Sequence, residues 1–255
     1  MADEVLGALE LERRAFGALT LGVVMTAGDA ATDSFVKIKT RAAARLGIDI
    51  SRIELGPDAD DAEAVYATEE LVKNTQGIIV QLPLPAGVNV AKVLDVLPES
   101  HDVDALGGNR LVRPPVAEAI AEIFSRSGVS ASGKRAVVVG AGRLVGAPAA
   151  QLLGDLGAKV EVITRSQGSL LELKNADIVV LGAGDPGFVK PGMLKEGVVL
   201  IDAGTSEEGG RLAGDAAPEC AEAASVFTPV PGGVGPLAVA MIFKNLLTLA
   251  HAQQK

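Results

Sequence analysis

Three closely spaced glycines mark a possible nucleotide-binding turn. Gly140, Gly142 and Gly146 follow the apolar run Ala136–Val139 and precede a segment with the composition of a helix. In a strand–turn–helix of this kind, glycines let the backbone approach a pyrophosphate, and free N–H groups at the helix start attract anions. The spacing is G-x-G-x-x-x-G rather than G-x-G-x-x-G, so the interpretation depends on the strand and helix around it. These favour a dinucleotide site over a tight turn without a ligand.

The residues after the next expected strand bear on which dinucleotide binds. A site for NAD places a carboxylate about twenty residues beyond the glycines, where it accepts from the ribose hydroxyls. Here the strand Lys159–Thr164 is followed by Arg165 and Ser166, with no acid at that point. A guanidinium and a hydroxyl suit a 2′-phosphate, which favours NADP over NAD. The alternative is a solvated loop arginine.

Other residues that could do chemistry stand in the first half of the chain. Lys39 lies on an expected helix, and Asp102 and Asp104 share a polar loop. Gln81 follows an apolar run and comes just before two prolines, which end a strand. It therefore stands at the carboxyl edge of a sheet, where open α/β sheets bind ligands. Taken singly, each could be ordinary: a solvated lysine, a loop acid, or an amide bonded to backbone.

Composition limits the class of protein. The 255 residues are 48% apolar and include 30 glycines, which suits a compact α/β protein of one or two domains. A net charge of −9 argues against a general nucleic-acid binder. One cysteine, Cys220, excludes an internal disulfide framework. Without a signal peptide or an uninterrupted apolar run long enough to span a bilayer, we expect a soluble cytoplasmic protein.

Apolar runs and helical periodicity alternate along the chain and predict an α/β fold with parallel sheets. The expected strands are Leu19–Met25, Ser51–Leu55, the run starting at Gly77, Ala136–Val139, Lys159–Thr164, Asp177–Leu181, Val198–Ile201 and Ser225–Phe227. The expected helices are residues 4–15, a helix capped by Asp33 or Ser34 and ending near Leu46, Ala62–Asn74, Val88–Val96, Pro115 to about Ser127, Val145–Leu156, Ser169–Lys174 and Leu237–His251. From Gly133 the β-α-β-α-β order is that of a dinucleotide-binding fold.

Three motifs together resemble the bifunctional methylenetetrahydrofolate dehydrogenase/methenyltetrahydrofolate cyclohydrolase family, called FolD in bacteria. They are Gly77-Ile-Ile-Val-Gln-Leu-Pro-Leu-Pro85, Asp102-Val-Asp104 and Thr228-Pro-Val-Pro-Gly-Gly-Val-Gly-Pro236. The likeness extends from about Leu19 to the C-terminus. Both proline-rich motifs are much more specific than the glycine turn, and they occur in the expected order around a dinucleotide fold.

The resemblance implies two domains with a cleft between them. The folate domain comprises residues 1–118 and is completed by the C-terminal helix, 237–255, while residues 119–236 form a Rossmann-type NADP domain. It implies oxidation of 5,10-methylenetetrahydrofolate by NADP, then hydrolysis of the methenyl product to 10-formyltetrahydrofolate. The family usually forms homodimers through the cofactor domains, and the site needs no metal.

Site residues carry over by position. The catalytic set is Lys39, Gln81 and Asp104, in which Gln81 orients the lysine and Asp104 holds the pterin. Residues expected at the substrate are Phe35, Val80, Leu82, Pro231, Gly232, Gly233, Val234 and Gly235. Residues expected at the cofactor are Gly140, Ala141, Gly142, Arg143, Val145, Arg165, Ser166 and Thr205.

Several positions depart from the family pattern. Phe35 replaces a tyrosine, Ala141 replaces the arginine that binds the 2′-phosphate, Ala105 replaces a glycine, and Ala238 a threonine. Two further readings therefore stay open: a dehydrogenase with weakened cyclohydrolase activity, and a non-catalytic folate or nucleotide sensor. NAD is not excluded as cofactor. A shikimate-type dehydrogenase lacks these motifs.

Overall fold

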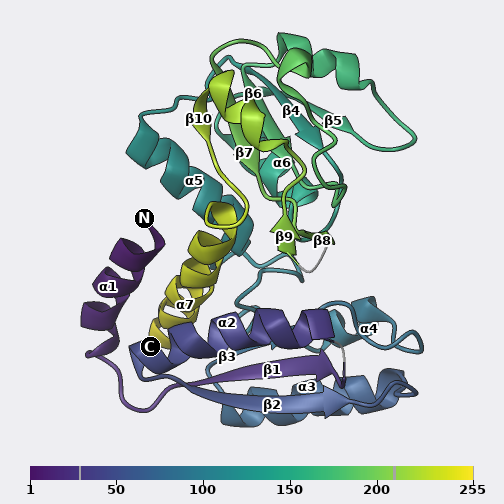
Figure 1. Cartoon of the computed structure of the whole chain (residues 1–255). Coiled ribbons are helices and arrows are strands. Elements are labelled where there is room, and N and C mark those ends of the chain that lie inside the picture. Colours follow the sequence, from purple (N-terminus) through teal and green to yellow (C-terminus); the bar gives the residue numbers. More distant parts are fainter. Residues whose placement is uncertain (29, 209–210, 255) are drawn as a thin grey trace. The chain divides into compact units, whose positions relative to one another are not determined.

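The computed structural model describes residues 1–28, 30–208 and 211–254, without the side chains of residues 30–35 and 207–211. The chain divides into two compact units (Figure 1). Residues Met1–Pro115 and Val239–Lys255 form the N-terminal unit, and Val116–Ala238 form the C-terminal unit. Each unit has a parallel sheet and a hydrophobic core of its own, which confirms the α/β class.

The N-terminal unit is built on a three-stranded parallel sheet in the order β2-β1-β3. Its strands are β1 (Thr20–Thr26), β2 (Asp49–Leu55) and β3 (Gly77–Val80). Leu21 of β1 pairs with Ile50 of β2 and with Gly77 of β3. All four residues of β3 are buried, as expected for an apolar run in a sheet covered on both faces.

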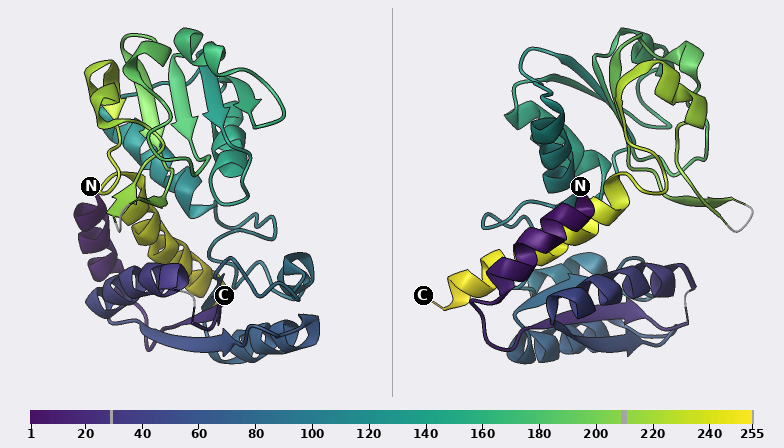
Figure 2. Two further views of the ribbon diagram at one scale, coloured as in Figure 1. Left: turned by 45° about the vertical axis from the view of Figure 1, so that its right-hand side comes forward. Right: turned by 60° about the vertical axis from the view of Figure 1, so that its left-hand side comes forward.

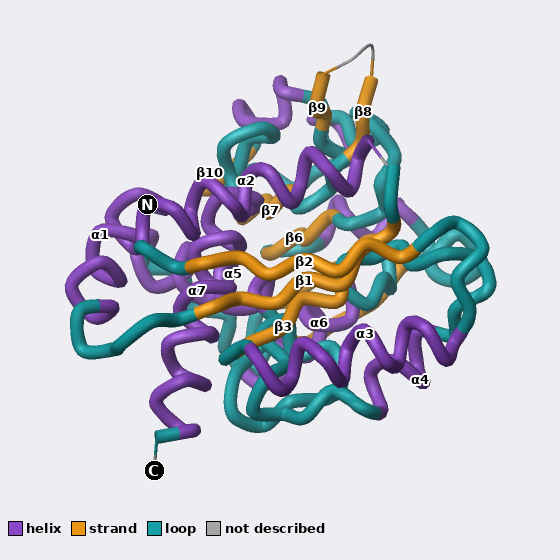
Figure 3. Tube along the Cα trace, turned by 90° about the horizontal axis from the view of Figure 1, so that it is seen from below, coloured by secondary structure: helices purple, strands orange, loops and turns teal. Residues whose placement is uncertain are grey.

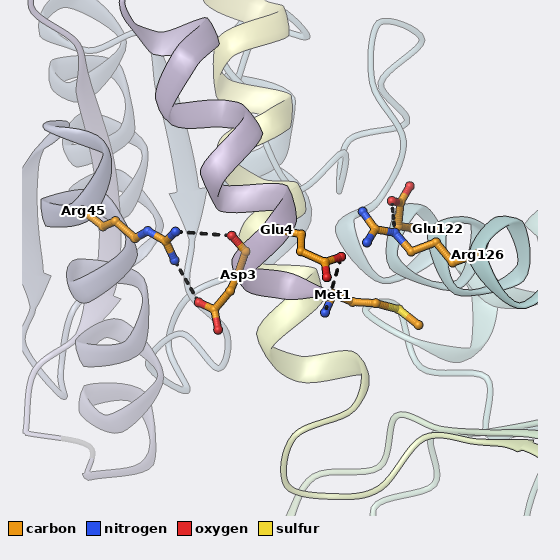
Figure 4. A network of polar contacts seen from close by, with 6 residues as sticks. All are labelled: Met1, Asp3, Glu4, Arg45, Glu122 and Arg126. Atoms are coloured by element: carbon orange, nitrogen blue, oxygen red, sulfur yellow. Dashed lines mark hydrogen bonds and ion pairs between the residues drawn. The ribbon is translucent and has the colours of Figure 1, made fainter.

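Helices cover both faces of this sheet. They are α2 (Ala30–Leu46), α3 (Asp61–Asn74) and α4 (Val90–Asp95), and α1 (Ala2–Arg13) packs against α2. Figure 3 shows α2 on one side of the strands and α3 with α4 on the other. Asp60 caps α3 in a reciprocal box with Glu63, which fixes where this helix begins. Arg45 of α2 reaches Asp3 of α1 (Figure 4).

The last helix, α7 (Val234–Gln253), is longer at both ends than the predicted Leu237–His251. Among the described residues it is the one helix whose length and composition would allow it to cross a membrane. Most of its apolar stretch is buried inside the protein, as in the core helix of a soluble protein. Asn245 in its middle donates two hydrogen bonds to backbone carbonyls.

The C-terminal unit has a five-stranded parallel sheet in the order β10-β7-β6-β4-β5 (Figure 2). The strands are β4 (Arg135–Val139), β5 (Lys159–Ile163), β6 (Ile178–Leu181), β7 (Val198–Asp202) and β10 (Ala224–Phe227). The chain moves from β4 outward to β5 and then returns to the other side of β4 with β6. The glycine turn after β4 therefore stands at the switch point of the sheet, where doubly wound folds bind ligands.

Shorter elements complete this unit. Helices α5 (Pro115–Ser127) and α6 (Gly146–Asp155) are accompanied by three 3₁₀ turns, Leu170–Asn175, Pro191–Met193 and Pro218–Glu222. A hairpin of β8 (Ser206–Glu208) and β9 (Arg211–Ala213) forms a separate two-stranded sheet.

Two predictions about elements were wrong. The helix expected to be capped by Asp33 or Ser34 begins earlier, at Ala30, so both residues lie inside α2. The segment Ser169–Lys174 forms a 3₁₀ turn rather than an α-helix, with Ser169 as its cap. The β8–β9 hairpin was not predicted, because its sequence is polar and lacks the apolar alternation that identifies strands.

Candidate active site

Lys39 and Gln81 are brought together by two adjacent elements of the N-terminal unit. Lys39 lies on α2, and Gln81 directly follows the buried strand β3. The Lys39 Nζ donates to Gln81 Oε1 over 2.7 Å, and Gln81 Nε2 donates to the carbonyl of Leu82 over 3.1 Å. The backbone bond at Leu82 fixes which end of the amide faces Lys39. Gln81 therefore holds the lysine in one orientation.

The surroundings of Lys39 favour its neutral form. Burial lowers the pKa of Lys39, although the negative charge of Asp104 opposes part of this effect. A buried ammonium loses hydration, and its hydrogen-bond partner here is a neutral amide rather than a carboxylate. A lysine of this kind exchanges its proton at a lower pH than a solvated lysine does.

Asp104 has the opposite tendency for the same physical reason. Burial raises the pKa of Asp104 to about 6; the charge of Asp102 adds to this, while Lys39 lowers it. The residue as a whole is partly exposed. The carboxylate of Asp104 and the amine of Lys39 thus interact electrostatically. They do not form a direct ion pair in the part of the chain that the structure describes.

The loop that carries Asp104 is fixed by its neighbours. Asp102 is buried, and its Oδ2 accepts from the N–H of Gly107 over 2.8 Å. Asp102 thus bonds within its own loop, whereas the carboxylate of Asp104 interacts electrostatically with Lys39. Ala105 has a φ of 53°, the left-handed region that favours glycine. The glycine expected there from the resemblance would adopt this turn without strain.

Asn245 is a supporting residue that sequence reasoning missed. It is buried on α7, and its Nδ2 donates to the carbonyl of Val103 over 2.9 Å and to that of Arg113 over 2.8 Å. Both acceptors flank the segment with Asp104. A lone amide in an otherwise apolar helix was the available signal, since buried polar groups require partners.

The other residues expected at the substrate differ in their surroundings. Val80 is buried in the core of the N-terminal unit, and Leu82 is partly buried beside it. The side chain of Phe35 lies outside the described part of the structure.

The glycine turn of the C-terminal unit has the form of a phosphate cradle. A Cβ atom at Gly140 would lie 2.4 Å from the carbonyl oxygen of Gly182, and one at Gly146 would lie 2.1 Å from that of Gly140. These two glycines are therefore required for close packing. A Cβ at Gly142 would meet no atom within 4 Å, so the backbone there is open to a ligand. Helix α6 begins at Gly146, directly after the turn, and the N–H of Ala147 donates to the carbonyl of Gly142 over 3.0 Å.

Residues suited to a 2′-phosphate follow β5. Arg165 and Ser166 are exposed, and the Ser166 hydroxyl lies 3.3 Å from that of Thr164. Arg143, Ala141 and Thr205 are also exposed. Val145 is partly buried, and its Cγ1 lies 2.4 Å from the place where a Cβ of Gly182 would be. The donors present fit a phosphate ester, whereas Val145 packs behind the turn.

The proline-rich segment after β10 is a tight loop. The Thr228 hydroxyl accepts from the N–H of Asp202 over 2.7 Å, which attaches the loop to the end of β7. The N–H of Gly233 donates to the carbonyl of Pro229 over 2.7 Å. Pro231, Gly232 and Gly235 are exposed, Gly233 is partly buried, and Val234 is buried at the start of α7. The loop therefore presents mainly backbone and proline to its surroundings.

Family models match both units of the chain. Residues 2–104 match the catalytic domain of tetrahydrofolate dehydrogenase/cyclohydrolase, and residues 114–254 match its NAD(P)-binding domain. The chain belongs to the tetrahydrofolate dehydrogenase/cyclohydrolase family. The bifunctional protein FolD of Macrococcus caseolyticus is 34% identical over 248 residues, covering 92% of this chain and 88% of the relative.

Solved structures of the family agree over the whole chain. The FolD enzyme of Campylobacter jejuni has a TM-score of 0.92 at 28% identity and covers 99% of this chain and 96% of its own. The Trypanosoma brucei enzyme, solved with NADP cofactor and inhibitor, has a TM-score of 0.91 at 32% identity. It covers 100% of this chain and 96% of its own. The fold expected from the family resemblance is confirmed.

Proposed function

We propose that the protein oxidises 5,10-methylenetetrahydrofolate with NADP and hydrolyses the methenyl product to 10-formyltetrahydrofolate. Family membership supports this function, and so does the Campylobacter jejuni structure, whose name gives both activities. The observation that carries it is the 2.7 Å bond between Lys39 and Gln81, with Asp104 close enough to affect the pKa of that lysine.

The C-terminal unit binds the cofactor. NADP, when bound, supplies the acceptor for a hydride from the one-carbon unit. Gly140, Gly142 and Gly146 admit its pyrophosphate to the backbone, and Arg143, Arg165 and Ser166 bind the 2′-phosphate in place of the family arginine lost at Ala141. The guanidinium of an arginine and the hydroxyl of Ser166 favour NADP over NAD, although the turn itself has Ala141 where the family has an arginine.

Asp104 binds the pterin of the folate. Its carboxylate accepts from the pterin amino group and the adjacent ring N–H, which requires the ionised form. Phe35, Leu82 and the backbone of Pro231–Gly235 are the further substrate contacts of the proposal, with Val80 behind them.

Lys39 is the proton acceptor of the hydrolysis. In its neutral form it removes a proton from water as the water oxygen bonds to the methenyl carbon. The bond from that carbon to one ring nitrogen then breaks as this nitrogen takes up a proton from Lys39. The hydroxyl of the adduct releases its own proton to water and becomes the formyl C=O, and the formyl group stays on the other nitrogen. Gln81 keeps the amine directed to this position throughout.

Replacing Lys39 by methionine tests the proposal. We expect Lys39→Met to lower cyclohydrolase turnover by roughly 10²–10⁴-fold, the range for a lost general base. NADP reduction should fall much less, because hydride transfer needs no lysine proton. Lys37→Met is the matched control, since Lys37 is an exposed lysine on the same helix. Unchanged hydrolysis in Lys39→Met would remove this residue from the mechanism.

The wild-type assays separate the remaining readings. NADP reduction with methylenetetrahydrofolate and loss of methenyl absorbance are measured on the same preparation. Reduction without hydrolysis would indicate a monofunctional dehydrogenase, and binding without either turnover would indicate a sensor.

The proposal extends to a cytoplasmic homodimer. The bacterial FolD relatives support a soluble enzyme, and the resemblance places the dimer contact in the cofactor unit. Light scattering on the purified protein measures its mass, and a monomer at assay concentration would refute this part.

A further inference from the structure

Two carboxylates of the C-terminal unit are almost completely buried. Asp202, at the end of β7, is 1% exposed, and Asp215, just after β9, is 0% exposed. Neither pairs with a lysine or arginine in the part of the chain that the structure describes. Burying unpaired charge is costly, so both must be compensated by hydrogen bonds.

Asp202 holds the segment that contains Asp215. Its Oδ1 accepts from the N–H of Gly204 over 3.0 Å and from that of Asp215 over 3.2 Å. Its Oδ2 accepts from the N–H of Ala216 over 2.8 Å. The end of β7 is thereby tied to the chain that follows β9.

Asp215 in turn holds the loop after β6. Its Oδ2 accepts from the N–H of Ala183 over 2.7 Å and from that of Gly184 over 3.2 Å. Its Oδ1 accepts from the N–H of Asp185 over 2.8 Å. Three consecutive backbone donors therefore converge on one carboxylate.

Two glycines make room for these side chains. A Cβ at Gly204 would lie 2.3 Å from the carboxyl carbon of Asp215, and one at Gly214 would lie 2.2 Å from Asp202 Oδ2. The carboxylate of Asp215 thus fills the space that a side chain at position 204 would need, and the carboxylate of Asp202 fills the space at position 214. Two features of the sequence accompany this arrangement: Asp202 ends an apolar strand, and Asp215 directly follows Gly214.

The loop held by Asp215 packs directly against the glycine turn. The carbonyl oxygen of Gly182 lies 2.4 Å from the position of a Cβ at Gly140, and Val145 closes on Gly182 in the same way. A shift of this loop therefore displaces the glycine turn, because the loop and the turn are packed too closely for either to move alone.

We propose that Asp202 and Asp215 are positioning residues for the dinucleotide. They act in series: Asp202 places Asp215, Asp215 places the loop after β6, and that loop sets the glycine turn. The inference rests on the proposed function, in which this turn binds NADP. A carboxylate is required because it only accepts, whereas an amide would direct an N–H₂ donor at backbone donors.

Asp215→Asn tests the proposal with Asp177→Asn as control. Asp177 also accepts a backbone N–H, that of Arg135 over 3.0 Å, but at the amino edge of the same sheet. Calorimetric titration with NADP alone should show affinity about tenfold weaker in Asp215→Asn, the size of one buried donor left unpaired. Asp177→Asn should bind NADP like the wild type. The KM for NADP should rise in Asp215→Asn while the KM for methylenetetrahydrofolate stays the same.

A second variant with its own control tests the proposal in case Asp215→Asn does not fold. Gly204→Ala retains both carboxylates and pushes Asp215 away, and Gly192→Ala, where a Cβ meets no atom within 4 Å, is its control. Normal NADP affinity in a folded Asp215→Asn or Gly204→Ala protein would overturn the inference. Wild type that binds NADP without turnover would overturn the proposed function and leave the inference intact.

Discussion

Burial pushes Asp104 and Lys39 of the proposed site in opposite directions on the pH scale. It disfavours whichever form is charged, so it raises the pKa of Asp104 to about 6 and lowers the pKa of Lys39. Each pKa is therefore shifted in the direction that favours the neutral form of its group. Their roles differ, because Asp104 must be charged to accept from the pterin and Lys39 must be neutral to take a proton.

The raised pKa of Asp104 predicts a pH-dependent KM. Above about pH 6 the carboxylate is ionised and binds folate; as the pH falls through about 6 it takes up a proton and loses acceptor capacity. We expect the KM for methylenetetrahydrofolate to rise below this pH, measured as a profile of kcat/KM with saturating NADP. In Asp104→Asn the KM should be high throughout and this limb absent. A wild-type profile that is flat through pH 6 would contradict the assignment.

Residue identity was only partly predictable from the sequence. Lys39, Gln81 and Asp104 were named by their match to a family motif, but their opposite pKa shifts depend on burial that the motif does not encode. Asp102 and Asp104 are two residues apart in one loop, and the left-handed turn at Ala105 is part of what gives them different surroundings. The two buried acids Asp202 and Asp215 stand 13 residues apart, one at the end of a strand and one in a loop, and no helix or strand period connects them.

Among the elements, α7 has a second role beyond filling the core. Through Asn245 it holds the carbonyls of Val103 and Arg113, on either side of the loop with Asp104. We expect Asn245→Ala to lower the free energy of unfolding by about 1–3 kcal/mol, because the buried carbonyl of Val103 loses its donor, as does the part-buried carbonyl of Arg113. The KM for folate should also rise, since the loop is released.

Thr248→Ala is the control for Asn245→Ala. Thr248 is exposed on the same helix, and its hydroxyl bonds only within α7, to Lys244. Urea unfolding compares the two variants. Equal loss of stability in both would show that the bonds of Asn245 contribute nothing specific.

The attachment of α1 predicts a contrast between apolar and ionic contacts. Leu9 is 4% exposed, whereas the ion pairs of Arg45 with Asp3 and Glu10 lie at the surface. Leu9→Ala should cost about 2–5 kcal/mol of unfolding free energy, the range for emptying a buried leucine site. Arg45→Met should change the urea midpoint little, because water and salt screen exposed pairs. Urea titration of both variants compares their losses of unfolding free energy. A larger loss in Arg45→Met than in Leu9→Ala would contradict the prediction.

Strands were easier to predict than helix starts for a physical reason. The buried strands are short apolar runs between turn residues, so β3, β4 and β6 appear where expected within a residue or two. The start of α2 was misplaced because polar residues that often cap a helix, Asp33 and Ser34, here lie inside it. Tertiary packing determines such boundaries more than local sequence does.

At the scale of the whole molecule, each unit has its own core. In the proposed function NADP is held by the C-terminal unit, whereas Asp104, which binds the pterin, belongs to the N-terminal unit. The core of the N-terminal unit gathers around Ile78 and Leu71, and that of the C-terminal unit around Val179 and Leu200. Units of this size with separate cores need not unfold together. Ligands offer a way to tell their transitions apart, since binding stabilises the unit that holds the site.

We therefore predict that NADP and folate stabilise different transitions in scanning calorimetry. At a free concentration of 100 times its Kd, a ligand adds about 2.7 kcal/mol to the unit that binds it. NADP should raise the Tm of the transition of the C-terminal unit, identified by loss of stability in Leu200→Ala. A folate ligand should raise the Tm of the other transition, identified with Leu71→Ala, and should shift the first transition less, because of the proposed folate contacts only Pro231–Gly235 lie in the C-terminal unit. A single transition, shifted equally by either ligand, would show that the two cores unfold as one.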